Sequence, residues 1–167
     1  MPKKEIFNKL FVYCFILPFV FFLTFIIIQP RNYYLSLEEF IHFMISKQIS
    51  YHPESILSPY GRPGFTLFSY FAILISNNYT NIISVKIMNA LFSSLSCYYF
   101  AKTIKLRHSS QKKAYWSVLF LITINLFFIY SFSAVSEIPC ITCVCIAYYW
   151  YEKNEFTKCA LILSFAF

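Results

Sequence analysis

An uncharged apolar run from Leu10 to Ile28 limits what this chain can fold into more than any other feature. As a helix, its 19 residues are long enough to cross about 30 Å of hydrocarbon. A secretory signal peptide has a shorter apolar core and a small-residue cleavage site, whereas this run is followed by Gln29 and Pro30. Three lysines precede it. We therefore expect an uncleaved transmembrane helix whose N-terminus is cytoplasmic.

The remaining chain has the same apolar character. Hydrophobic residues make up 59% of the sequence and charged residues only 13%, which is far from globular usage. Further apolar runs follow at 82–101, 115–132, 135–151 and 159–167, and we expect the fourth span to start before Pro139. The sequence thus predicts an all-α, polytopic helical membrane protein with a single membrane domain over 1–167. Because the last run stops after a few turns, we expect a fragment of a longer protein or a truncated copy.

The distribution of basic residues predicts the topology. The apolar segment 65–75 has 11 residues, which is too short to span. If it stays at the interface, the N-terminus, the predicted loop 102–113 and segment 153–158 are all cytoplasmic, and they hold ten of the fourteen Lys and Arg. If it crossed, the loop 102–113 would lie outside. The positive-inside rule favours the first arrangement. The loop 30–81 and the turn 133–139 then share the non-cytoplasmic face, while Lys86 snorkels at the end of its span.

The first outside loop carries most of the polar chemistry. Its residues Ser36 to Glu39 match a capping box that opens a helix. Apolar residues then recur at helical spacing: Leu37, Phe40, Ile41, Met44, Ile45 and Ile49. The opposite face carries Glu38, Glu39, His42 and Ser46. We expect an amphipathic juxtamembrane helix lying in the interface, with its polar face turned to water. A loop from Tyr51 to Pro63 should follow.

Five polar residues are candidates for function. Glu38 and Glu39 could act as a general base, and Arg62, held between a glycine and a proline, could bind a phosphate as a planar fork. The capping box alone also explains Glu39, the helix dipole explains Glu38, and lipid headgroups explain Arg62. His42 is interpreted as a solvated interface residue in a supporting role rather than as a metal ligand. Glu137, beside apolar spans, is expected to face an aqueous cavity or the interface.

Bulk features exclude other classes of function. The chain has only two glycines, which excludes a glycine-rich phosphate loop. Its net charge of +7 is interpreted as a signature of membrane orientation, so no nucleic-acid partner is expected. Cys140, Cys143 and Cys145 resemble a metal or redox motif. We interpret them as small apolar residues of a membrane helix, because the sequence offers no second ligand pair.

The order of these features resembles the N-terminal part of the GT-C superfamily of membrane glycosyltransferases. The similarity is to aminoarabinose transferases and protein O-mannosyltransferases, which use polyprenyl-phosphate sugars. Those enzymes have an Asp-Glu pair opening a juxtamembrane helix, then a basic-Pro step, then an acidic turn. Here Glu38-Glu39, Arg62-Pro63 and Ser136-Glu137-Ile138-Pro139 take those places.

This resemblance implies an activity and its site. Glu38 would activate the acceptor, and Arg62 would hold the donor phosphate of a polyprenyl-phosphate sugar on the non-cytoplasmic face of the inner or plasma membrane. The acceptor would be a lipid, glycan or protein. No cofactor is implied, and a divalent metal is left open. The family enzymes have many more spans, so these 167 residues alone are expected to be inactive. The alternative is a non-catalytic membrane scaffold or assembly subunit, which needs packed helices and no site.

Overall fold

The computed structural model describes residues 9–28, 37–57, 63–76 and 82–164. Every regular element in these ranges is helical, which confirms the all-α prediction. The elements are η1 (Val12–Ile16), α2 (Leu17–Ile28), α3 (Leu37–Gln48), η2 (Pro53–Leu57), α4 (Pro63–Ser76), α5 (Ile83–His108), α6 (Gln111–Thr123), α7 (Asn125–Ser131), α8 (Glu137–Glu152) and α9 (Phe156–Ser164).

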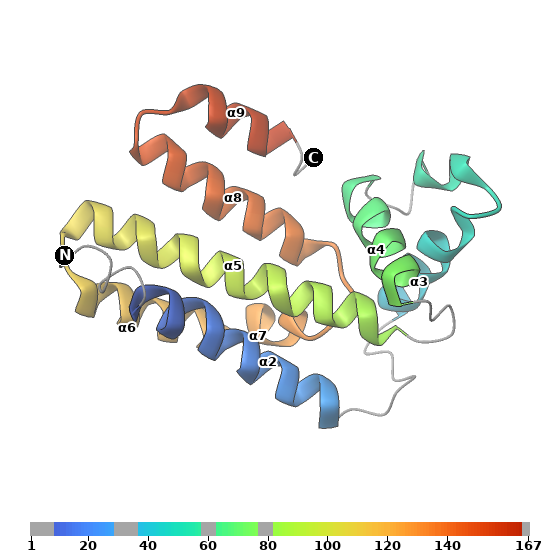
Figure 1. The fold of residues 1–167 in the computed structure, drawn as a ribbon, viewed down its shortest axis with the longest axis horizontal. Helices are drawn as coiled ribbons and strands as arrows, with labels where there is room; N and C mark the ends of the chain where they lie inside the picture. The colour runs from blue at the N-terminus through green and yellow to red at the C-terminus, as the bar shows by residue number, and fades with distance from the viewer. Residues whose placement is uncertain (1–8, 29–36, 58–62, 77–81, 165–167) are drawn as a thin grey trace.

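The long helix α5 forms the centre of the bundle. It contacts α2, α4, α6, α7 and α8 (Figure 1). Its buried side chains are mostly small, which lets neighbouring helices approach closely. The α8 contact is polar as well as apolar, because the hydroxyls of Ser96 and Thr142 lie 2.8 Å apart. Thr142 also donates to its own helix at the Ile138 carbonyl, 2.8 Å away.

The first helix changes its hydrogen-bond pattern before Pro18. Residues Val12–Ile16 form a π-helical turn, in which the Leu17 N–H bonds the Val12 carbonyl. Pro18 has no N–H to give to the carbonyl four residues earlier, so the widened turn reorganises the backbone where the proline would break it. From Lys9 to Ile28 the stretch has a mean hydropathy of 2.8 and is long and apolar enough to cross a membrane.

By length and composition, fewer of the described helices could cross a membrane than the sequence predicts. Within the described ranges, Lys9–Ile28 is the one helical stretch that qualifies, and the α6–α7 pair would be a second if counted as one span. Helices α5 and α8 nevertheless overlap most of the predicted ranges 82–101 and 135–151, and α8 begins before Pro139 as expected. Helix α4 contains the short apolar stretch Gly64–Ile75, which covers the segment predicted as too short to span.

The predicted continuous helix over 115–132 is wrong. Helices α6 and α7 meet at an angle of 79°. Ile124 between them is extended, with φ −66° and ψ 116°. The Thr123 hydroxyl bonds back to the Phe120 carbonyl at 2.7 Å. Polar side chains such as Thr123 and Asn125 offer the backbone such local alternatives, and this helps to end α6 inside an apolar run.

The predicted loop over 102–113 is also wrong, because most of it is helix. Helix α5 continues to His108, and α6 begins at Gln111. Ser109 has a positive φ of 50°, and the Ser110 hydroxyl caps α6 by accepting from the Lys113 N–H at 3.3 Å. Lysine and arginine are good helix formers and are favourable at a helix C-terminus, so the basic run extends α5. Only two serines make the turn.

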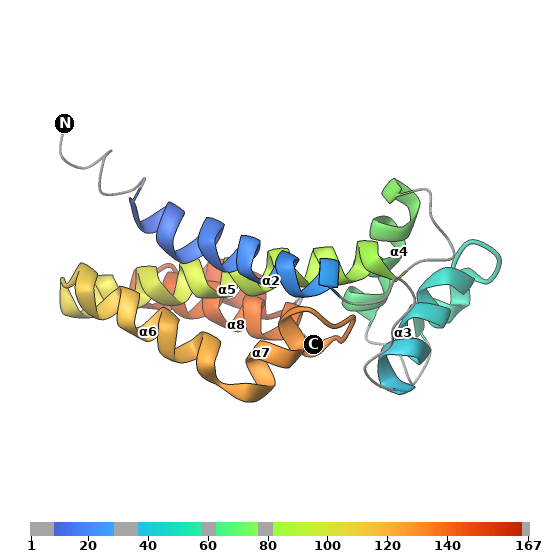
Figure 2. The same cartoon turned by 90° about the horizontal axis from the view of Figure 1, so that it is seen from below.

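Helices α3 and α4 stand together at the N-terminal end of α5, away from the α5–α6 turn (Figures 1 and 2). They share a separate apolar cluster with the start of α5 and the turn before α8. Its buried members are Phe43, Phe65, Ile73, Ile82, Val85 and Ala134. The predicted loop after Tyr51 contains the short 3-10 helix η2. This cluster fixes the first outside loop of the sequence prediction against the end of the bundle.

Candidate functional site

The side chains of Glu39 and Lys86 form a buried ion pair between α3 and α5. The Glu39 Oε1 atom lies 3.5 Å from the Lys86 Nζ atom, and the two side chains are 0% and 2% exposed. The same Oε1 accepts a hydrogen bond of 2.7 Å from the Ala134 N–H. One carboxylate thus ties together α3, α5 and the turn before α8, three parts of the chain that are distant in sequence.

Asn89 fixes the same turn from the next turn of α5. Its Nδ2 atom donates to the carbonyls of Ser133 and Val135, each at 2.7 Å. Lys86 and Asn89 are three residues apart and therefore lie on one face of the helix. Buried carbonyls need partners, so this amide satisfies two of the groups that the turn leaves outside any helix. The turn is held by Asn89 on one side and by Glu39 on the other.

The predicted orientation of α3 is wrong. Glu39, His42 and Ser46 were expected to face water, but all three are buried, at 0%, 4% and 0% exposure. Leu37 and Phe40 are instead exposed. The physical reason is the charge on Lys86: a buried ammonium needs a carboxylate, and the polar face of α3 supplies one. The predicted snorkelling of Lys86 is wrong for the same reason.

His42 lies one turn of α3 after Glu39. Its ring packs edge-on against Phe65 of α4, with the ring centroids 5.3 Å apart. Ser46 follows one turn later and donates to the His42 carbonyl at 2.8 Å. The polar face of α3 is therefore part of the packing between α3 and α4, not a solvated surface.

Of the other predicted site residues, the structure describes Glu137 close to this contact. Glu137 is the first residue of α8, three residues after Ala134, and is half-buried. Glu38 is in the first turn of α3, and its side chain lies outside the described residues. Arg62 also lies outside the described residues. The structure therefore brings Glu39 and the turn before Glu137 together, with His42 one helical turn away.

Sequence reasoning missed Lys86 and Asn89 as members of the site. A signal for them exists, because they are a charged and a strongly polar residue at a three-residue spacing inside a predicted span. A charge within apolar surroundings usually has a partner. The sequence does not say which of the seven glutamates that partner is.

Helix α4 presents further polar groups to the interior. Thr66 and Ser69 lie on one face of α4 and are fully buried. Their hydroxyls make no hydrogen bond within the described part of the chain. Buried hydroxyls in proteins usually form hydrogen bonds to protein or to water. The hydroxyls of Thr66 and Ser69 can therefore still donate to a polar group.

Two other features lie apart from this contact. An apolar groove of about 880 Å³ lies between α2 and α6, lined by Tyr13, Phe21 and Leu119 among others, and by none of the residues of the contact between α3, α5 and the turn before α8. In the described ranges the six cysteines are free, and no three His, Cys or Glu side chains gather as metal ligands.

The arrangement limits what each acid can do. Glu39 is engaged by an ammonium and a backbone N–H, so its carboxylate stabilises the packing of α3 and is poorly placed to accept a substrate proton. Glu38 precedes it by one residue in the first turn of α3. Comparisons with protein-family models, with curated proteins and with solved structures found no match to this chain.

Proposed function

We propose that this chain is the N-terminal part of a GT-C-type membrane glycosyltransferase. The enzyme moves a sugar from a polyprenyl-phosphate donor to an acceptor on the non-cytoplasmic face. Glu38 is the general base, Arg62 binds the donor phosphate, and Glu39 is a positioning residue. The observation that carries the proposal is the buried contact of Glu39 with Lys86 and Ala134.

This contact supports catalysis by fixing the start of α3. A general base works only when it is held within reach of the proton it removes, and a misplacement of about 1 Å costs roughly a hundredfold in rate. Taking a carboxylate and an ammonium out of water is expensive, and apolar residues often do as well for stability. The Glu39–Lys86 pair is therefore better explained by the need to hold the neighbouring Glu38 in place than by a gain in stability.

We propose in addition that the chain is a multi-pass membrane protein. The basic residues at the ends of α5 and α8 and the start of α6 support this proposal. They lie at the end of the bundle opposite α3 and α4 (Figure 1). The bundle therefore has one basic end and one end that carries the proposed site, as the positive-inside rule requires of a cytoplasmic and a non-cytoplasmic face.

Cysteine labelling tests this topology. In a cysteine-free background, Ser50→Cys and Ser109→Cys each place one thiol at an exposed position, near the proposed site and in the α5–α6 turn respectively. A membrane-impermeant maleimide applied to intact cells should modify the first and not the second. Permeabilised cells are the control, in which both should react. Labelling of Ser109→Cys alone in intact cells would contradict the topology.

A transfer assay tests the function. Because the proposal makes this chain the N-terminal part of a larger enzyme, the assay uses membranes that carry the full-length protein, called the extended protein below. A radiolabelled polyprenyl-phosphate sugar is the donor. Arg62→Ala removes a charge-assisted contact worth about 1.5–3 kcal/mol, so the donor KM should rise by about ten- to a hundredfold. Arg62→Lys should recover part of this, since an ammonium lacks the planar fork.

Lys47→Ala is the matched control for loss of a positive charge, because Lys47 lies in the last turn of α3. Its donor KM should stay within about twofold of the wild type, as expected for a change away from the phosphate. An equal rise in both variants would show that Arg62 acts only through overall charge. Absence of any transfer by the extended protein would favour the competing interpretation, a non-catalytic scaffold in which the Glu39–Lys86 pair serves packing alone.

A further inference from the structure

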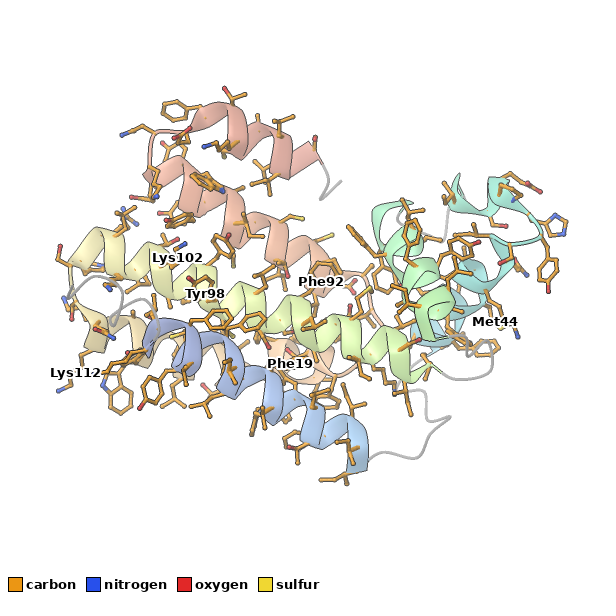
Figure 3. All side chains as sticks on the ribbon, in the orientation of Figure 1. Phe19, Met44, Phe92, Tyr98, Lys102 and Lys112 are labelled. Carbon is orange, nitrogen blue, oxygen red and sulfur yellow. The ribbon has the colours of Figure 1, made fainter. Side chains whose placement is uncertain are left out.

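A second cluster of charged residues lies at the opposite end of the bundle, where α5 and α8 end. Two ammonium groups converge there on one aromatic ring. The Nζ atoms of Lys102 and Lys153 lie 4.3 Å and 5.0 Å from the ring centroid of Tyr149. Lys102 is also 5.1 Å from the ring centroids of both Tyr98 and Tyr99 (Figure 3). Cation–π contacts thus hold two positive charges close together.

Acidic residues do not balance this pair of charges. Glu152 pairs with Arg107 at 3.4 Å, and Glu155 pairs with Lys158 at 3.3 Å. No carboxylate of the described residues lies within 4.0 Å of the ammonium of Lys102 or Lys153. A hydrogen bond to Tyr149 raises the pKa of Lys153, so its charge is retained at neutral pH. The cluster therefore has an excess of positive charge, which the neutral ring of Tyr149 contacts but does not cancel.

The surroundings of the cluster are aromatic and apolar. Lys158 and Lys153 lie over Trp150, at 4.4 Å and 5.3 Å from its ring centroid. Tyr151 and Phe156 are exposed beside them and meet edge-on, with their centroids 5.7 Å apart. Tyrosine and tryptophan at helix ends are typical of the boundary between a membrane and water. A ligand bound at the lysines would therefore be in contact with apolar side chains as well.

We propose that Lys102, Lys153 and Tyr149 form a binding site for the phosphate group of an acidic phospholipid. The phosphate diester carries one negative charge and accepts hydrogen bonds, which two ammonium groups and a phenolic hydroxyl can donate. Basic pockets between helices bind such headgroups, and the exposed aromatic rim suits the adjoining acyl chains better than it suits free phosphate. The site lies at the end of the bundle away from α3, so it does not depend on the proposed glycosyl transfer.

Fluorescence of Trp150 provides the measurement. The chain has two tryptophans, so Trp116→Phe leaves Trp150 as the single reporter. The detergent-solubilised protein is titrated with phosphatidylglycerol or phosphatidylcholine in mixed micelles, and native mass spectrometry counts the bound lipids. Phosphatidylglycerol should bind about tenfold or more tightly than phosphatidylcholine. Lys102→Gln and Lys153→Gln should each weaken it by roughly tenfold, as expected for a lost charge-assisted contact. Lys102→Arg, which keeps the charge, should retain most of the binding.

Lys112→Gln is the matched control, because it makes the same change in net charge at an exposed position of α6. It should leave phosphatidylglycerol binding unchanged. An equal loss in this control, or equal binding of the two lipids, would overturn the proposal. Competition by millimolar inorganic phosphate would overturn the lipid as the source of the phosphate group. Circular dichroism checks the fold, and if Lys102→Gln unfolds, Lys153→Gln decides, because Lys153 is exposed and lies in a turn.

Discussion

Replacement of Glu39 by glutamine is expected to lower the free energy of unfolding by about 3–5 kcal/mol. The variant removes the carboxylate that lies 3.5 Å from the Lys86 ammonium, which is 2% exposed. Breaking a buried ion pair is far more destabilising than the loss of a surface pair. Denaturant unfolding of the 167-residue chain in detergent micelles, followed by circular dichroism, gives the free energy directly.

A second substitution separates charge from hydrogen bonding. In Glu39→Gln with Lys86→Met, no charge remains, and the glutamine oxygen can still accept from the Ala134 N–H. This double variant should recover most of the lost stability, since replacing a buried pair by apolar groups is often neutral. Glu155→Gln breaks an exposed pair of 3.3 Å and should cost less than about 1 kcal/mol. If Glu39→Gln cost no more than Glu155→Gln, the buried pair would have no structural role.

Replacement of Glu38 by glutamine is expected to lower the turnover number of the extended protein by about 10²–10⁴. Glutamine keeps the shape of the side chain and loses its basicity, so the donor KM should change little. Because the variant keeps Glu39, which makes the buried pair with Lys86, it should also unfold at about the same denaturant concentration as the wild type. The measurement is the transfer assay with the polyprenyl-phosphate sugar, at saturating donor.

Glu54→Gln is the control for this prediction. Glu54 is exposed in η2 and pairs with His52, with Oε1 and Nδ1 3.1 Å apart. A backbone hydrogen bond, together with His52, lowers the pKa of Glu54, so this carboxylate is a weak base. Its loss should leave turnover within about twofold. A Glu38→Gln variant with full activity would show that Glu38 is not the base, even if Arg62→Ala weakens the donor.

Local signals in the sequence predicted the helices but not all of their ends. Apolar runs and Pro139 predicted where α5 begins and, to within two residues, where α8 lies, because burial of such runs does not depend on distant partners. The ends of α5 and α6 were predicted wrongly, because Lys and Arg were interpreted as a loop when they are also good helix formers. The break at Ile124 depends on backbone bonding by side chains such as Thr123, which apolarity alone does not indicate.

The orientation of α3 was not predictable from its own residues. Its apolar stripe is only partly buried, with Ile45 and Ile49 inside and Leu37 and Phe40 exposed, because amphipathicity records only which side chains avoid water. The position of Lys86, 47 residues after Glu39, decides which face turns inward. Nothing in the spacing of either segment assigns that lysine to that glutamate. Of the candidate site, the sequence therefore predicted Glu39 and the nearby acidic turn, but neither the ion pair nor the role of Asn89.

The ion pair also has a consequence for the order in which the protein is made. Glu39 is synthesised well before both of its partners, and the Ala134 N–H follows it by 95 residues. At roughly 5–20 residues per second, that delay is about 5–20 s. During this time the Glu39 carboxylate lacks its hydrogen bond from the Ala134 N–H, although Phe65 and Lys86 are synthesised before Ala134. The packing of α3 is therefore completed only after the turn before α8 has been made, and stalling translation between residues 86 and 134 should leave Glu39 without this hydrogen bond.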